Sequence, residues 1–128
     1  MTDLNLTFGP YTPVRKAGNF YFISGQVGVD PLTKTASADV AQQTKQVLYN
    51  LESLLAEQNL TMNDVIKTAI FVTNIDDFAS VNAVYETFFD NPRPARSTVQ
   101  VAALPKVAGE TPLVVEIEAV AYKEAEAA

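Results

Sequence analysis

The sequence predicts an α+β fold in which two helices pack on one face of a mixed β-sheet. Short segments alternate apolar and polar side chains with the period of two that is typical of strands, and two longer segments carry apolar side chains at helical spacing. Their order is strand, strand, helix, strand, helix, strand, strand, with connections long enough for crossovers. With 128 residues, 48% of them hydrophobic, residues 1–128 are expected to form one domain.

Two strands are expected near the start of the chain. The alternating segment Asn5–Phe8 suits a short edge strand, and residues 16–19 suit a turn. The segment Asn19–Ser24 is rich in aromatic and β-branched side chains, which favour a strand. This strand is expected to stop at Gly25 and to continue as Gln26–Val29. A glycine at such a break lets another group approach the backbone closely.

Two helices with a strand between them are expected in the middle of the chain. The first helix is predicted over Ala38–Gln58, the strand over Val65–Thr73, and the second helix from Asp76 to the break at Asn91-Pro92. Apolar residues at helical offsets form one stripe on each helix. The stripe residues are Val40, Val47, Leu48, Leu51, Leu54 and Leu55 on the first helix and Phe78, Val81, Tyr85, Phe88 and Phe89 on the second.

The last two predicted strands carry charged residues that suit chemistry. Residues 95–101 and 114–121 alternate in the manner of strands. If these two strands pair, Arg96 on the first can face Glu116 or Glu118 on the second. A guanidinium group binds a planar carboxylate through two parallel hydrogen bonds. Without further context, an arginine beside a glutamate is more often a structural ion pair than a functional one.

The composition excludes several kinds of site. The chain contains no Cys and no His, which rules out disulfides, thiol catalysis, Cys-ligated metals and the common forms of His-based catalysis. A formal net charge of −6, with only 9 scattered Lys and Arg, argues against nucleic-acid binding. No apolar run suits a membrane span, and the polar start Met1–Asn5 does not suit a signal peptide, so a cytoplasmic protein is expected.

The predicted architecture leaves one face of the sheet without helices. Apolar residues expected to contribute to that face include Val27, Val29, Val99 and Val101. A bare apolar sheet face normally marks an interface between copies of a chain. We therefore expect a homo-oligomer.

Six short motifs follow one another along the chain: Gly9-Pro-Tyr11, Ile23-Ser-Gly-Gln26, Val81-Asn-Ala-Val-Tyr85, Pro94-Ala-Arg-Ser97, Ala103-Leu-Pro105 and Val115-Glu-Ile-Glu-Ala119. In this order they resemble the RidA/YjgF family, and the resemblance covers almost the whole chain. It implies a chorismate-mutase-like sandwich that assembles as a homotrimer, with the sheets facing inward and clefts between subunits.

The resemblance also implies a chemistry. Members of this family hydrolyse reactive enamines and imines, such as 2-aminoacrylate and 2-iminopropionate, to 2-keto acids and ammonia. Pyridoxal-phosphate-dependent dehydratases release these intermediates, which implies a functional link to such enzymes. The resemblance further implies that the chain itself needs no cofactor and no metal.

By the same resemblance, Arg96 binds the substrate carboxylate through two hydrogen bonds. Glu116 holds the water that attacks the imine carbon, and then helps to protonate the departing nitrogen. The connection from Pro105 to Glu116 is several residues longer than is typical of the family, which shifts the possible register of the last strand. Glu118 therefore stays open as the residue that faces the water.

Four further residues match positions that line the same cleft. Tyr11 and Ser24 would orient substrate or water, and backbone groups of Gly25 and Thr98 would complete the lining. Thr98 stands where relatives often carry Cys. Tyr11 can instead pack under the N-terminal segment, and the Ser24 hydroxyl can instead bond the backbone at the end of a strand.

Two other functions are compatible with parts of this pattern. A regulatory module could bind a small carboxylate or 2-keto acid through Arg96 without turnover. Some relatives are described as endoribonucleases or translation inhibitors, but the absence of His and the net charge of −6 weigh against RNA cleavage.

Overall fold

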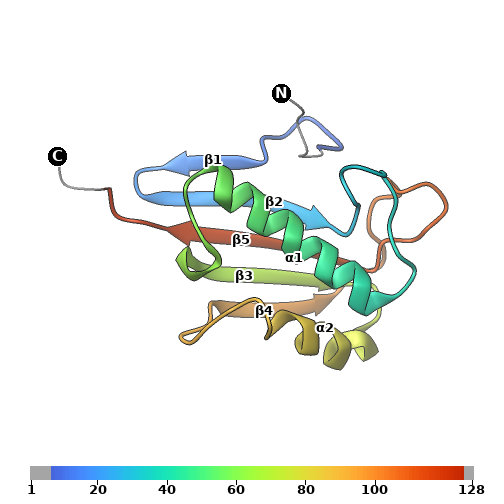
Figure 1. Cartoon of the computed structure of the whole chain (residues 1–128). Coiled ribbons are helices and arrows are strands. Elements are labelled where there is room, and N and C mark those ends of the chain that lie inside the picture. Colours follow the sequence, from blue (N-terminus) through green and yellow to red (C-terminus); the bar gives the residue numbers. More distant parts are fainter. Residues whose placement is uncertain (1–6, 126–128) are drawn as a thin grey trace.

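The computed structural model describes residues 7–125, which form a five-stranded sheet with two α-helices on one face (Figure 1). The strand order is β1-β2-β5-β3-β4, and every pair of neighbours is antiparallel except β3 and β4, which are parallel. This confirms the predicted α+β sandwich. The elements are β1 (Val14–Ala17), β2 (Phe20–Val27), α1 (Val40–Glu57), β3 (Val65–Val72), α2 (Phe78–Tyr85), β4 (Ala95–Gln100) and β5 (Val115–Tyr122).

The N-terminal strands differ from the prediction. Of the segment expected as an edge strand, Asn5 and Leu6 lie outside the described residues, and Thr7 and Phe8 are not in a strand. The edge position belongs to β1 instead, which joins β2 through a turn at Gly18 (φ 59°). Glycine suits this backbone conformation because it has no Cβ atom to clash.

The helices begin and end close to the predicted residues, with one exception. Helix α1 is capped by Asp39, whose side chain accepts a hydrogen bond from the backbone N–H of Ala41 at 3.1 Å. Helix α2 is shorter than expected, because residues 87 and 88 donate to the carbonyls three residues earlier and tighten the chain into turns before Pro92. None of the helices in residues 7–125 is long and apolar enough to cross a membrane.

The predicted pairing of the last two strands is wrong. Strand β3 lies between β4 and β5. The reason is visible in the burial of β5, in which every second residue from Val115 to Ala121 is buried, whereas β4 has no fully buried residue. A strand with a continuous buried stripe belongs in the centre of the sheet, and a polar strand is tolerated at its edge.

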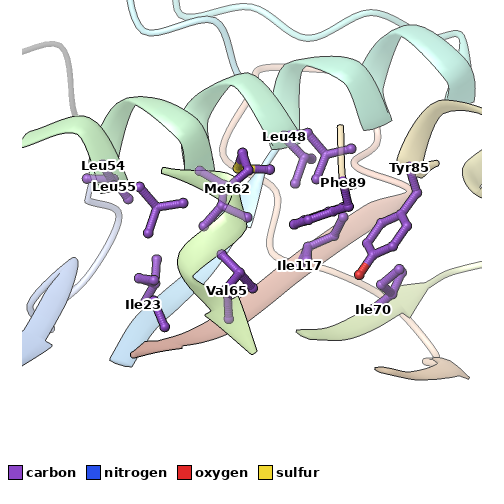
Figure 2. Packing of buried hydrophobic residues seen from close by; sticks show 14 of the residues in the cluster. Ile23, Leu48, Leu54, Leu55, Met62, Val65, Ile70, Tyr85, Phe89 and Ile117 are labelled. Atoms are coloured by element: carbon purple, nitrogen blue, oxygen red, sulfur yellow. The ribbon is translucent and has the colours of Figure 1, made fainter. Parts of the chain in front are cut away.

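The core lies between the helices and the sheet. Leucines of the α1 stripe, including Leu48 and Leu55, point toward Ile23 and Ile117 of the sheet (Figure 2). In the same view, Tyr85 lies above Ile70 and Phe89 lies above Ile117. Burying side chains of this size stabilises a fold by about 1.5–3 kcal/mol each. This core fixes the faces from which the polar residues of the site project.

The opposite sheet face is partly apolar, as predicted. Phe20, Phe22 and Val99 project from it with 42%, 49% and 47% of their surface exposed. Val27 shares this face, because it pairs with Glu116 of β5. The expectation for Val29 is wrong: it is 1% exposed and packs with Ala108 and Leu113 beneath the long connection before β5. We call the helix-free side the open face.

Candidate functional site

Arg96 lies in a cavity of about 370 Å³ between β4 and α2, which we call the arginine pocket. In β4, Arg96 is the register partner of Thr68 in β3, and both side chains lie on the helix side of the sheet. Its guanidinium carbon is 5.0 Å from the ring centroid of Tyr85 and 5.5 Å from that of Phe78. The pocket is lined by Asn82, Tyr85, Glu86, Arg93, Pro94 and Arg96.

The aromatic rings hold the Arg96 guanidinium without neutralising it. A cation over an aromatic face is attracted by about 0.5–1 kcal/mol at exposed sites. Within residues 7–125, no carboxylate forms an ion pair with Arg96. Its hydrogen-bond donors are therefore available to an anion from outside the chain.

Tyr85 is fixed below the arginine by a buried hydrogen bond. Its hydroxyl oxygen is 2.7 Å from the hydroxyl oxygen of Thr68. Burial raises the pKa of Tyr85, an effect that the Thr68 hydrogen bond and the charges of Arg96 and Arg93 partly offset. A raised pKa keeps the phenol neutral, so Tyr85 supports Arg96 as a ring and not as a counter-ion.

Two polar atoms near this pocket have no hydrogen-bond partner within the described chain. They are Oδ1 of Asn82, on α2, and Oγ1 of Thr98, which follows Arg96 by two residues on β4. Thr98 shares the helix side with Arg96, since its register partner is Ile70. The structure thus brings Thr98 near Arg96 along the strand but leaves it out of the residues that line the cavity.

The second half of the predicted site is a cavity of about 330 Å³, which we call the glutamate pocket. It brings together Tyr11, Ser24, Gly25, Glu116 and Glu118, all predicted from the sequence. Strands β2 and β5, the N-terminal segment and the connection before β5 each supply part of its wall. The remaining lining residues are Phe8, Val27, Pro105 and Val107.

Glu116 is held against the backbone of Gly25. A Cβ atom at position 25 would lie 2.7 Å from Cδ and 2.9 Å from Oε2 of Glu116, closer than real contacts allow. The glycine is therefore required for this approach. Burial raises the pKa of Glu116, and the charge of Glu118 raises it further. A carboxyl group with a raised pKa is a stronger proton acceptor than an ordinary glutamate, which suits it to general acid–base chemistry.

Glu118 lies on the same face of β5 but in a different environment. It is exposed, whereas Glu116 is half-buried. Glu118 also borders a neighbouring cavity of about 320 Å³ that contains Arg15 and Lys67. Glu116 packs against Gly25 and has a raised pKa, whereas Glu118 is exposed. Of the two carboxyl groups, Glu116 is therefore the one that the pocket holds in place.

The hydroxyl groups of Ser24 and Tyr11 already have partners inside the chain. The Ser24 hydroxyl donates to the carbonyl of Thr12 at 2.7 Å. The Tyr11 hydroxyl accepts a hydrogen bond from the backbone N–H of Phe8 at 3.2 Å. These bonds hold the N-terminal segment over the glutamate pocket, and they leave each oxygen with capacity to accept a further hydrogen bond.

The long connection before β5 is anchored by a buried glutamine of α1. Gln43 Nε2 donates to the carbonyls of Ser37 and Pro112 at 2.9 Å and 3.0 Å, and Gln43 Oε1 accepts from the N–H of Val114 at 2.8 Å. Gly28 makes room for the glutamine, since a Cβ there would lie 2.6 Å from the Gln43 carbonyl oxygen. Two residues at the start of the connection, Pro105 and Val107, form part of the wall of the glutamate pocket.

Arg96 and Glu116 lie on opposite faces of the sheet within one chain. Arg96 pairs with Thr68, whereas Glu116 pairs with Phe71, three residues later on the same strand. The side chains of register partners on adjacent strands project from the same face of the sheet. Two residues an odd number of positions apart on one regular strand project from opposite faces. The arginine and glutamate pockets are therefore separate, and the predicted direct facing of the two residues is wrong.

Sequence reasoning missed Arg93, Glu86 and Gln43. Arg93 directly precedes the motif Pro94-Ala-Arg-Ser97 that contains Arg96. Its position next to this motif is a sequence signal that it lies close to Arg96. Gln43 is a polar residue within the apolar stripe of α1, which is a sign of a buried hydrogen-bonding role. In residues 7–125, no three Asp or Glu side chains are grouped as ligands for a metal ion.

The fold and the two cavities define a small α+β protein with ligand-sized polar pockets on both faces of its sheet. A family model described as Endoribonuclease L-PSP matches residues 3–123, and the chain therefore belongs to this family, the RidA/YjgF family. The 2-iminobutanoate/2-iminopropanoate deaminase of Escherichia coli K12 is 42% identical over 118 residues, which cover 90% of this chain and 88% of that protein. A RutC family protein of Pyrococcus horikoshii is 44% identical over 117 residues, 91% of this chain and 89% of that protein.

Solved structures agree with this assignment. The YjgF gene product of E. coli has a TM-score of 0.84 and 41% identity, with 94% of this chain and 93% of that chain covered. E. coli TdcF with bound serine has a TM-score of 0.84 and 38% identity, with 94% and 93% covered.

Proposed function

We propose that this protein hydrolyses 2-imino acids, formed directly or from enamines such as 2-aminoacrylate, to 2-keto acids and ammonia. Relatives named as 2-iminobutanoate/2-iminopropanoate deaminases support this substrate class. A family structure that holds serine supports a ligand of amino-acid size. The observation that carries the proposal is the pairing of two features: an arginine without a counter-ion in one pocket and a carboxyl group with a raised pKa in the other.

The proposed chemistry needs no strong nucleophile. Arg96 binds the substrate carboxylate through two hydrogen bonds and orients the imine. Glu116 takes a proton from a water molecule as the water oxygen adds to the imine carbon, and it passes this proton to the nitrogen, which gives a carbinolamine. Glu116 then moves the hydroxyl proton of the carbinolamine to the nitrogen, the C=O bond forms as the C–N bond breaks, and ammonia leaves. Holding the water and the imine in a reactive arrangement supplies much of the acceleration.

The active site is proposed to form between copies of the chain. One chain holds Arg96 and Glu116 on opposite sheet faces, so one copy's arginine pocket would meet another copy's glutamate pocket. The exposed Phe20, Phe22 and Val99 of the open face support burial against a partner. A homotrimer with inward-facing sheets, as the family resemblance implies, satisfies both requirements through three equivalent contacts.

A dehydratase-coupled assay tests the proposal. Purified protein is added to a pyridoxal-phosphate-dependent serine or threonine dehydratase, and 2-keto acid release is followed over time. The wild type should accelerate release, and Arg96→Ala should remove the acceleration while the oligomer stays intact by size-exclusion chromatography. Lys16→Ala, which removes a positive charge from β1 at the opposite edge of the sheet, is the matched control. Acceleration that persists in Arg96→Ala would refute the proposed role of Arg96.

Binding without turnover is the alternative that the same residues permit. In that case the wild type would bind 2-keto acids by calorimetry but would not change the rate of 2-keto acid release. Arg96→Ala would weaken binding under either function, so the rate measurement with wild-type protein is the one that distinguishes them.

A further inference from the structure

The arginine pocket contains a second guanidinium group. Arg93 lines the same cavity as Arg96 and lies in the segment between α2 and β4. Its only polar contact in residues 7–125 is a donation from Nη2 to the carbonyl of Glu86, and at 3.5 Å this contact is at the limit of a hydrogen bond. Arg93 therefore keeps most of its donors for another partner.

The charges around this cavity do not cancel. Arg93 and Arg96 supply two positive charges, and Glu86 is the one carboxylate among the lining residues. Neither arginine has an ion pair within the described part of the chain. The chain as a whole carries a net charge of −6, so this local positive excess runs against the overall charge.

The charges of the two arginines are felt in the same cavity. The charges of both lower the pKa of the Tyr85 hydroxyl, whose ring lies 5.0 Å from the Arg96 guanidinium carbon. Arg96 is held in place by Tyr85 and Phe78, while Arg93 projects from an exposed loop. Arg96 is thus a fixed cation and Arg93 an adjustable one. Such a pair suits a ligand with two anionic groups, because Arg93 can adapt to the spacing between them.

We infer that Arg93 determines substrate specificity, and that the preferred substrates are imino acids whose side chain carries a second carboxylate. This inference rests on the proposed function. Arg96 would bind the 1-carboxylate next to the imine, and Arg93 would bind the side-chain carboxylate of a four- or five-carbon 2-imino dicarboxylic acid. Water adds to the C=N bond and ammonia leaves as before, so the second carboxylate is unchanged by the reaction.

The physical reason is charge complementarity. A monocarboxylate neutralises one of the two guanidinium groups and leaves the other without a counter-ion, whereas a dicarboxylate pairs both. A hydrogen bond to a charged group is stronger than one between neutral groups, but solvent screens the charge of the exposed Arg93. We therefore expect a preference of about tenfold for the dicarboxylate.

Imines generated in the assay itself test this inference. D-Aspartate oxidase forms imino dicarboxylic acids from D-aspartate and D-glutamate, and D-amino acid oxidase forms the monocarboxylic imines from D-alanine and D-2-aminobutyrate. Semicarbazide traps the imine that has not been hydrolysed, with catalase present to remove peroxide. We expect the ratio of kcat/KM for dicarboxylic over monocarboxylic imines to fall about tenfold in Arg93→Ala and to be partly kept in Arg93→Lys.

Two matched variants sharpen the result. Lys16→Ala removes one positive charge at the far edge of the sheet and should leave the ratio unchanged. Glu86→Gln removes the one carboxylate among the lining residues and should raise the ratio, because it increases the positive potential in the pocket. A ratio that Arg93→Ala does not alter would overturn the inference, whatever the total activity.

Binding measurements separate this inference from the proposed function. Calorimetry with 2-oxoglutarate and 2-oxobutanoate compares a dicarboxylate and a monocarboxylate without any turnover. A preference for 2-oxoglutarate that is lost in Arg93→Ala supports the specificity of the pocket even if no imine is hydrolysed, in which case the proposed function alone fails. Equal affinity for the two acids in the wild type overturns the inference.

Discussion

The carboxyl group of Glu116 occupies the space that a side chain at position 25 would need. In Gly25→Ala the new methyl group would lie within 3 Å of the carboxyl carbon, so the carboxylate must move. A displacement of about 1 Å of a group that positions water can cost roughly 10²-fold in rate. We expect a loss of this order in kcat for imine hydrolysis, with the same far-ultraviolet circular dichroism as the wild type.

Gly18→Ala is the control for this change. Position 18 has φ 59°, and no atom lies within 4 Å of the place that an alanine methyl group would take, so alanine there strains the backbone without touching either pocket. We expect Gly18→Ala to lower the free energy of unfolding by about 1 kcal/mol and to keep its activity per folded molecule. Equal activity in the two variants would show that the contact with Gly25 does not position Glu116.

The raised pKa of Glu116 predicts a pH dependence of stability. Burial and the charge of Glu118 make the folded state bind the Glu116 proton more tightly than the unfolded chain does. The group then stabilises the fold below its unfolded pKa, and this contribution is lost as the pH rises through its folded pKa. Relative to the wild type, Glu116→Gln should therefore gain stability on going from acidic to neutral pH.

The size of this effect is limited, since Glu116 is only half-buried and solvent screens its charge. We expect a relative gain below about 1 kcal/mol, measured by urea unfolding at several pH values. Glu118→Gln should show a smaller gain, because it removes only the repulsion. Over the same series, kcat of Glu116→Gln should fall about 10²-fold or more. If the difference in free energy of unfolding between the wild type and Glu116→Gln did not vary with pH, the pKa of Glu116 would not be raised in the folded protein.

Among the elements, the helices and the faces of the strands could be predicted from the sequence. The stripe on α1 contains residues that are buried, such as Leu48 and Leu51, because helical periodicity reports directly which side is apolar. The alternation on β5 likewise placed Glu116 and Glu118 on one face. Pocket residues such as Tyr11 and Ser24 were found through family motifs and not through periodicity.

The order of the strands in the sheet could not be predicted in the same way. Alternation shows which residues share a face of one strand, but it contains no information on which strand lies beside it. Consecutive strands pair often enough that β4 and β5 were expected to be neighbours, and β3 lies between them instead. The pairing of Arg96 with a glutamate depended on that neighbour relation and failed with it.

The connection between β4 and β5 depends on its anchor to α1. Gln43→Ala removes three partly buried hydrogen bonds and leaves the Val114 N–H and the Pro112 carbonyl without this partner. We expect the free energy of unfolding to fall by about 2–4 kcal/mol and KM to rise, because Pro105 and Val107 line the glutamate pocket.

Urea unfolding and amide hydrogen exchange at Val114 check this prediction. Gln42→Ala is the matched control. Gln42 lies next to Gln43 on α1 but its side chain is exposed, so its loss should change the free energy of unfolding by less than about 0.5 kcal/mol. If the two variants lost equal stability, the three hydrogen bonds of Gln43 would not anchor the connection.

In the whole molecule, the two pockets are separated by the sheet itself. The helix side presents a guanidinium held by aromatic rings, and the open face presents a carboxyl group held against a glycine. No movement of a side chain within one chain joins groups that project from opposite faces. A site that uses both therefore requires two copies, which is why the assembly and the activity are predicted to depend on each other.

Mixing two inactive variants tests this dependence. In a trimer that combines Arg96→Ala and Glu116→Gln chains, a contact is functional when one chain supplies the intact arginine and its neighbour supplies the intact glutamate. Random mixing of equal amounts, by co-expression or refolding, should restore about a quarter of the wild-type sites, because each partner has the required residue in half of the cases. Each variant refolded alone should stay inactive. Recovery of imine hydrolysis in the mixture supports a shared site, whereas a mixed oligomer without recovery would mean that Arg96 and Glu116 do not act together across a subunit contact.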